Sequence, residues 1–232
     1  MNKSKLFKVL LLSIVLITGV SQFAYAALPS PPWSECYWYD DPGAATVYNI
    51  NHNLYYIGYD ARVYGNTHAY YVRRTMYEDA VFYIHTHGYT GGGRVKCANN
   101  TKISALMVLG DDSNYSLQAR YGDTTDKLKY TRLTYWAACH TAESSNTYGD
   151  LDNYCYWILG VDSTVAFNGI RDVINGPYFD DRFFVYAALS GYNVGDALNR
   201  AKNDAVNKYG YAPNYVYMGG GVKIKPPSYG NY

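Results

Sequence analysis

Two stretches of the sequence end in side chains that can carry out chemistry. The apolar run 80–84 is followed by His85-Thr86-His87-Gly88, and the mostly apolar run 133–138 is followed by Cys139. Short runs of this kind are typical of strands that are buried on both faces of a parallel sheet. Reacting groups collect just beyond the carboxyl ends of such strands. If the two strands are neighbours, the sequence predicts an imidazole beside a thiol.

That pair of side chains indicates nucleophilic catalysis on an acyl group. A thiol attacks an acyl carbon as the thiolate, and a nearby imidazole can take its proton. We therefore expect Cys139 to be the nucleophile and His87 to be the base, which later protonates the leaving amine. The backbone N–H groups of Gly88 and Cys139 are expected to form the oxyanion hole. The alternative is that His87 is a structural histidine and Cys139 a small buried apolar residue.

The same region also allows a metal interpretation. His85, His87, Cys139 and His140 could together form a zinc site, since both residue types bind zinc. The sequence has neither an H-E-x-x-H motif nor a Cys-x-x-Cys pair to support that interpretation. We therefore predict no metal and no organic cofactor in the site. His85 is expected in the floor of the site, and His140 on the turn after the nucleophile.

The elements that must position these residues alternate along the chain. Strands are expected at 35–39, 60–65, 80–84, 127–138, 163–167 and 215–218, helices at 44–59, 68–78, 111–121, 178–190 and 194–209, a hairpin from 93–97 and 103–109, and a helical crossover at 144–160. In that crossover Tyr154, Trp157 and Ile158 should pack inward. Alternating strands and helices predict one α/β domain with a mostly parallel central sheet flanked by helices and right-handed crossovers.

The two motifs that end these strands resemble those of a known family. His85-Thr86-His87-Gly88 together with Ala137-Ala138-Cys139-His140-Thr141 resembles the caspase-like cysteine peptidases, which include the caspase, gingipain and separase types. The patterns of the CHAT branch, H-x-x-T-H-G and S-A-C-x-T, are the most similar. The order of His and Cys along the chain matches that of the family. Their separation of 139 − 87 = 52 residues fits the spacing of about 50 residues expected for this arrangement. The resemblance covers roughly residues 35–220 and implies a caspase-like three-layer sandwich with cysteine endopeptidase activity.

The resemblance also implies a substrate-binding acid. The stretch 168–172, Asn-Gly-Ile-Arg-Asp, resembles the acid-bearing segment of CHAT proteins and separases, in which an acid meets a basic substrate side chain. Asp172 is the matching position, although Arg171 before it departs from the family pattern. Cleavage after Arg or Lys is the implied specificity. The alternatives are that Asp172 pairs with Arg171 or caps the next helix.

The amino-terminal residues indicate export. Three lysines precede the apolar run 9–20, and Ala24-Tyr25-Ala26 follows it, as in a secretory signal peptide cleaved after Ala26. The apolar run is shorter than the roughly 20 residues that span a bilayer, and an uncleaved anchor is the alternative. The expected domains are a signal peptide at 1–26, an extended leader at 27–34, a peptidase domain at 35–222 and a Pro/Gly/Tyr-rich tail at 223–232.

The net charge and the composition limit the classes of binding partner that we expect for this protein. Removing three lysines changes the formal net charge from +1 to +1 − 3 = −2. Without a basic stripe, neither nucleic acid nor an anionic membrane is expected as a partner, and the expected partner is a polypeptide substrate. The chain has 29 tyrosines, which suggests the competing class, a non-catalytic extracellular binding or adhesion module with a tyrosine-rich surface.

Two further sites are left open by the sequence. Beside Cys139 the chain has Cys36, Cys97 and Cys155, and an exported protein can pair two of them. A Cys36–Cys155 disulfide is weakly favoured over pairings with Cys97, and no disulfide at all is the alternative. Oxygen ligands for calcium could come from three residues of the crossover, Asp150, Asp152 and Asn153.

Overall fold

A six-stranded sheet forms the centre of the molecule. The computed structural model describes residues 32–40, 43–76, 78–105, 128, 130–143 and 150–226. The sheet has the order β2-β1-β3-β6-β7-β8. Its strands are β1 (Trp33–Trp38), β2 (Asp60–Gly65), β3 (Asp79–His85), β6 (Leu133–Ala137), β7 (Thr164–Phe167) and β8 (Tyr215–Met218). The first five run parallel and β8 is antiparallel to β7, which confirms the prediction of a mostly parallel sheet.

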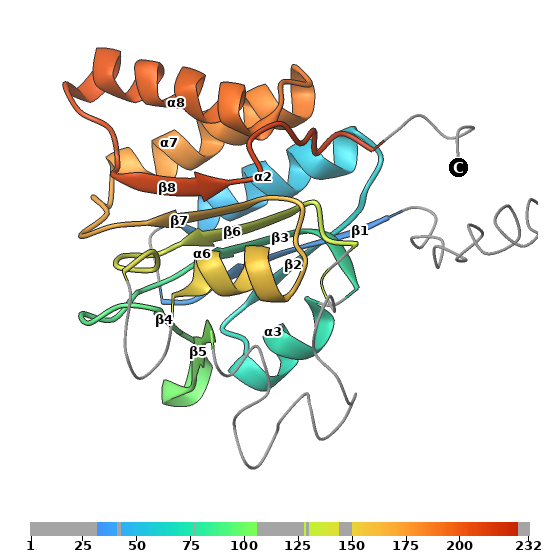
Figure 1. Cartoon of the computed structure of the whole chain (residues 1–232), viewed down its shortest axis with the longest axis vertical. Coiled ribbons are helices and arrows are strands. Elements are labelled where there is room, and N and C mark those ends of the chain that lie inside the picture. The colour runs from blue at the N-terminus through green and yellow to red at the C-terminus, as the bar shows by residue number, and fades with distance from the viewer. Residues whose placement is uncertain are drawn as a thin grey trace, which may run out of the picture.

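Helices cover both faces of the sheet and make three layers (Figure 1). One face packs against α2 (Ala44–Tyr56), α7 (Asn175–Phe184) and α8 (Val194–Tyr209). The other packs against α3 (Ala69–Thr75) and α6 (Leu151–Asn153). Single π-helical turns, η2 (Tyr154–Ile158) and η3 (Val185–Leu189), extend α6 and α7. This arrangement is the predicted sandwich of a central sheet flanked by helices.

The two strands that lead to the predicted active site are buried throughout. Every residue of β3 and β6 is buried. Their side chains alternate between the two cores: Tyr83 and Tyr135 face the α2 and α7 side, whereas Phe82 and Trp136 face the α3 and α6 side. A strand that is covered on both faces needs apolar or aromatic side chains on both. The continuous apolar pattern in the sequence therefore reflects the central position of these strands.

Parts of the expected secondary structure lie outside the described residues. These are the signal peptide, most of the leader, the helix at 111–121 and the start of the crossover at 144–149. The predicted hairpin is present as β4 (Arg94–Lys96) and β5 (Lys102–Ser104), joined by the 3₁₀ turn η1 (Ala98–Asn100), and its expected residues 106–109 lie outside the described part of the chain. At the other end of the domain, Ile224 is fully buried, and the Tyr59 hydroxyl donates to its carbonyl. Packing therefore continues two residues past the expected boundary at 222.

The inward packing expected for the crossover is wrong for two of its three residues. Trp157 is 73% exposed and Ile158 is also exposed, whereas Cys155 and Leu159 are buried. The reason is the π-helical turn, in which the Leu159 N–H bonds to the Tyr154 carbonyl five residues earlier. A π-helical turn changes the angular spacing of side chains, so the α-helical period selects the wrong inward residues.

The weakly favoured Cys36–Cys155 disulfide is also wrong. All four cysteines are unpaired. Cys36 packs in the core on the α2 side of the sheet, and Cys155 packs in the core on the α6 side. The sheet therefore separates the two sulfur atoms. Burial raises the pKa of the Cys36 thiol well above its usual value and that of Cys155 to about 12, so both behave as small apolar side chains.

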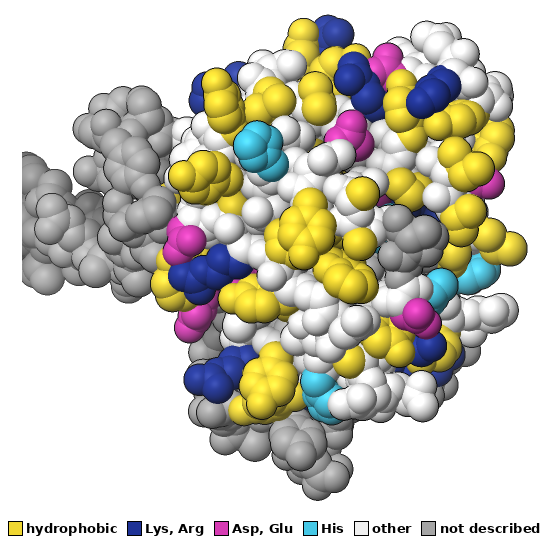
Figure 2. Space-filling model, turned by 180° about the vertical axis from the view of Figure 1, so that it is seen from behind, with side chains coloured by type: hydrophobic (Ala, Val, Ile, Leu, Met, Phe, Trp, Pro, Cys, Tyr) yellow, Lys and Arg dark blue, Asp and Glu magenta, His cyan; other side chains and the backbone are white. Residues whose placement is uncertain are grey.

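Within the described part of the chain, none of the helices is both long and apolar enough to cross a bilayer. On the face that Figure 2 shows, basic and acidic side chains are interspersed with apolar ones.

The acidic residues of the crossover have structural roles in the fold. Asp150 caps α6, with its Oδ1 atom accepting the Asn153 N–H at 3.2 Å. Asp152 is buried, and its Oδ1 atom has no hydrogen-bond partner among the described residues. Burial, together with the charge of Asp150, raises the pKa of Asp152 to about 6.

This carboxyl group should make stability depend on pH. An unfolded Asp titrates near 3.9, so ionising the buried group costs stability as pH rises from about 4 to about 6, by up to about 3 kcal/mol. Asp152→Asn removes that cost. We expect the difference in unfolding free energy between the variant and the wild type, from urea titrations, to grow by up to that amount between pH 4 and pH 7. A difference that is constant with pH would contradict this.

Candidate active site

The ends of β3 and β6 lie side by side. The two strands pair in parallel with His85 opposite Ala137, and the Thr86 N–H donates to the Ala137 carbonyl at 3.3 Å. Beyond these pairs, a Cβ built on Gly88 would lie 1.6 Å from the carbonyl oxygen of Cys139. Only glycine fits this contact, because any side chain would overlap the backbone of Cys139. The structure therefore brings together the two segments that the sequence singled out.

The backbone at this contact has two donors without partners. Neither the Gly88 N–H nor the Cys139 N–H makes a hydrogen bond to another described residue. Gly88 is held in place by its neighbours: the Lys96 N–H donates to the His87 carbonyl at 2.8 Å, and the Tyr89 N–H donates to the Arg94 carbonyl. Two unpaired N–H groups on adjoining segments can together bind a developing oxyanion.

The ring of His87 is exposed and is oriented by a backbone carbonyl. Its Nε2 atom lies 3.1 Å from the carbonyl oxygen of Asp40, which follows β1. A carbonyl can only accept a hydrogen bond, so Nε2 carries the proton and Nδ1 keeps its lone pair. A base oriented by a third group is a common feature of nucleophilic catalysis. Asp40 could not be predicted from the sequence, because a backbone carbonyl has no residue type to recognise.

The sulfur of Cys139 is held by the loop that follows β7. The Arg171 N–H donates to Sγ at 3.2 Å, and Sγ lies 3.9 Å from the Arg171 carbonyl. Cys139 is half-buried. The side chains of His87 and Cys139 do not form a direct hydrogen bond with each other. Such contacts are often loose before substrate binds.

A buried ionic cluster anchors Arg171 from the other side. Its guanidinium donates to both carboxylate oxygens of Asp180 on α7, each at 2.7 Å. Asp180 is fully buried and also accepts from the Tyr135 hydroxyl at 2.6 Å and the Tyr83 hydroxyl at 2.9 Å. Burial and the charge of Asp180 raise the pKa of both tyrosines well above the usual value. Asp180 was not among the predicted site residues, although the hydroxyl groups of two buried tyrosines require a buried partner.

The other two histidines have different surroundings. His85 is buried, with Nδ1 3.1 Å from the Tyr83 hydroxyl and 3.8 Å from Asp180. His140 has a left-handed backbone, and its Nδ1 lies 2.6 Å from Glu143, whose pKa it lowers by hydrogen bonding. Within the described residues, no three His, Cys, Asp or Glu side chains are arranged to hold a metal ion.

Asp172 is exposed and begins the turn into α7. Its Oδ1 atom accepts the N–H groups of Ile174 and Asn175, both at 2.8 Å, and these bonds lower its pKa. Arg171 pairs with Asp180 instead of Asp172, so the alternative of an Arg171–Asp172 pair is wrong. The structure shows the capping alternative, and a hydrogen bond with the Tyr211 side chain lowers the pKa of Asp172 further.

Comparison with known proteins supports the fold. No family model and no curated protein matches the sequence. Among solved structures, the Arg-specific cysteine proteinase gingipain R matches with a TM-score of 0.61 at 8% sequence identity. The match covers 84% of this chain and 48% of that chain, so the chain spans about half the length of gingipain R. At this identity the match shows the fold alone: the chain has the caspase-like fold that the motifs implied.

The buried cluster yields a stability prediction. Asp180→Asn leaves the Arg171 guanidinium buried without a counter-charge, which should cost about 3–5 kcal/mol of unfolding free energy. The milder Tyr135→Phe removes one hydrogen bond to a charged group and should cost about 1.5–3 kcal/mol. Urea unfolding monitored by circular dichroism measures both.

The neighbouring residue provides the control for this prediction. Asp181→Asn changes the same residue type at the next, half-buried position and should cost under about 1 kcal/mol. Equal losses for Asp180→Asn and Asp181→Asn would show that the cluster does not hold the fold together.

Proposed function

We propose that the chain is a secreted cysteine endopeptidase in which Cys139 is the nucleophile and His87 the base. The observation that carries this proposal is the contact between Gly88 and the Cys139 backbone, which joins the two motif segments at one edge of the sheet. The caspase-like fold, shared with a cysteine proteinase, supports it. Secretion is supported by the charged, apolar and A-x-A segments at residues 3–26.

In this mechanism the Nδ1 atom of His87 takes the proton of the Cys139 thiol, and the thiolate attacks the peptide carbonyl carbon. The new oxyanion accepts hydrogen bonds from the N–H groups of Gly88 and Cys139. His87 then gives its proton to the leaving amine, and an acyl-enzyme remains. Water, deprotonated by His87, hydrolyses the thioester. The Asp40 carbonyl holds the ring and stabilises its charged form between these steps.

The loop 168–174 is suited to the substrate residues that precede the scissile bond. Its three apolar side chains, Ile170, Val173 and Ile174, are 83%, 70% and 64% exposed, more than any other Val, Leu or Ile side chain among the described residues. Hydrogen bonds from His140 to Gly169 and from Arg171 to Cys139 fix the loop beside the nucleophile. Exposed apolar side chains gathered at one place indicate a binding surface.

Asp172 lies among these side chains and would meet a basic residue directly before the scissile bond. The specificity of gingipain R for Arg fits this assignment by analogy. Because Asp172 is exposed, its contribution to discrimination should be that of a surface ion pair, about fivefold.

The dyad is tested by removing each partner. Cys139→Ala should abolish hydrolysis of an unfolded protein substrate, and His87→Ala should lower kcat by about 10²–10⁴-fold, the contribution of a positioned base. Circular dichroism should show both variants folded. Cys97→Ala changes a buried cysteine in the core on the α3 and α6 side of the sheet, and this variant should keep its activity. Full activity in Cys139→Ala would contradict the dyad, whereas a folded wild type that hydrolyses no substrate would favour the binding-module alternative.

The loop is tested with a peptide library that varies the residues before the scissile bond. We expect wild type to prefer Arg or Lys at the cleaved position and apolar residues before it. Asp172→Ala should reduce the preference for basic residues about fivefold. Ile170→Ser should reduce the preference for apolar residues before the cleaved position and should leave the preference for Arg or Lys at the cleaved position unchanged.

A remote acid serves as the control for the library. Asp196, which is exposed in the first turn of α8, occupies a comparable helix start, and Asp196→Ala should leave both preferences unchanged. A wild-type preference for Asp, Asn or an apolar residue at the cleaved position would contradict the role of Asp172 and leave the dyad untouched.

A further inference from the structure

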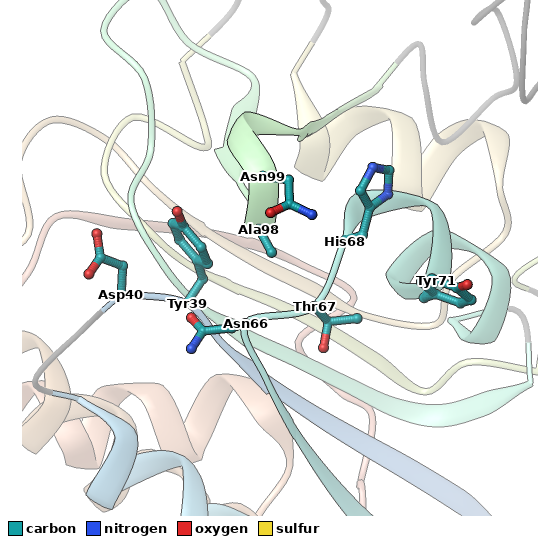
Figure 3. Close-up of a pocket in the computed structure, with 8 residues that line it drawn as sticks. All are labelled: Tyr39, Asp40, Asn66, Thr67, His68, Tyr71, Ala98 and Asn99. Atoms are coloured by element: carbon teal, nitrogen blue, oxygen red, sulfur yellow. The ribbon is translucent and has the colours of Figure 1, made fainter.

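An open pocket of about 610 Å³ lies beside the candidate base, at the carboxyl ends of β1 and β2 (Figure 3). Its lining comes from the residues after β1, from the turn between β2 and α3, from α3 itself and from η1. Asp40 belongs to both sites: its side chain lines the pocket, and its carbonyl holds the Nε2 atom of His87 at 3.1 Å. The pocket therefore adjoins the group that would protonate the leaving amine.

Three residues of the pocket have an unusual backbone. Asp40, Asn66 and Asn99 have φ angles of 46°, 50° and 56°, in the left-handed region that favours glycine. Asn and Asp usually tolerate this region through local side-chain hydrogen bonds. None of these three side chains makes a hydrogen bond to another described residue. The chain therefore has three polar side chains, without hydrogen-bond partners among the described residues, at positions where glycine would cost less.

We propose that this pocket is the subsite for the departing part of the substrate, and that it takes a polar, uncharged side chain of the second or third residue after the scissile bond. The inference rests on the proposed peptidase function. It names a specificity site on the leaving side, which neither the motifs nor the comparison with gingipain R assigns.

The order of the strands sets the direction and the distance. Across the edge of the sheet the sequence of groups is the pocket over β2 and β1, then His87 after β3, Cys139 after β6, and the loop 168–174 after β7. The acyl part stays on Cys139 and the amine leaves past His87, so the departing peptide runs toward the pocket. Strands are about 4.8 Å apart, so the near edge of the pocket, over β1, lies two spacings, about 10 Å, from the scissile bond at Cys139. An extended peptide covers that distance in about three residues.

The lining sets the chemistry of the side chain. The amides of Asn66 and Asn99 each donate and accept hydrogen bonds, and Tyr39 adds a hydroxyl on an aromatic ring. The Asp40 carboxylate would repel an acidic side chain. The Lys96 ammonium lies 5.2 Å from the Tyr39 ring, so a basic side chain would also meet a like charge. Gln, Asn, Ser and Thr fit this lining best.

The test compares two fluorogenic peptides that share every residue up to the first one after the scissile bond. One ends there, and the other continues through two glutamines and a glycine. We expect the longer peptide to have about tenfold higher kcat/KM in the wild type, the size of one or two net hydrogen bonds. In the double variant Asn66→Gly, Asn99→Gly this ratio should fall below twofold. The variant should still fold, because glycine adopts the left-handed backbone of both positions without strain.

Asn100 provides a matched control for the double variant. It is the same residue type, next to Asn99, with a φ of 57°, and it does not line the pocket. Asn100→Gly should keep the tenfold ratio. A wild-type ratio near one, or a ratio that the double variant does not change, would overturn the subsite while hydrolysis itself leaves the peptidase function standing.

Binding without catalysis separates the two proposals. A labelled peptide with a free amino terminus, Ser-Gln-Gln-Gly, should bind the Cys139→Ala protein, and binding should weaken about tenfold when the two asparagines are also changed to glycine. Binding of this kind in a protein that hydrolyses no peptide would keep the pocket and reject the peptidase. Absence of binding to Cys139→Ala, or equal binding with and without the two changes, would overturn the subsite.

Discussion

The carboxylate of Asp180 on α7 is fully buried and meets three parts of the chain that carry the candidate site. Tyr83 reaches it from the strand that leads to His87, Tyr135 from the strand that leads to Cys139, and Arg171 from the loop that holds the Cys139 sulfur. A buried charge is tolerable only while its partners stay in place. If the loop that carries Arg171 moved away from Cys139, the Asp180 carboxylate would stay buried without its counter-charge. The positions of the sulfur and of both strand ends depend on this one interaction.

Much of the fold could be predicted from local patterns. The bounds expected for β2, α8 and β8 agree with the structure, because each of these elements has clear end signals in its own residues. The α8 helix, for example, begins after the capping Asn193 and ends at Gly210, which has a left-handed backbone. The central position of β3 and β6 was readable because burial on both faces requires apolar residues in succession. The parallel order then followed from the alternation of strands and helices.

Other features depend on contacts between distant residues, and the sequence could not show them. The partner of Arg171 is nine positions away on a helix, where nothing local distinguishes Asp180 from Asp181. The carbonyl of Asp40 orients His87 from another strand, and any residue there would supply the same atom. The α-helical period predicted that Trp157 packs inward, but a π-helical turn shifts the angular spacing of the side chains and leaves Trp157 exposed. Local pattern therefore found the two site segments, and tertiary packing decided how each side chain is held.

The central claim is that the thiol of Cys139 is a nucleophile activated by His87. The most direct measurement treats the purified protein with a peptidyl acyloxymethyl ketone that carries Arg or Lys next to the ketone, and locates the adduct by peptide mass spectrometry. The account predicts one adduct, on Cys139, and none on the buried Cys36, Cys97 or Cys155, whose thiol pKa values burial raises. It also predicts that His87→Ala slows this labelling strongly. Absence of an adduct on Cys139, or labelling that is equally fast without His87, would contradict the account.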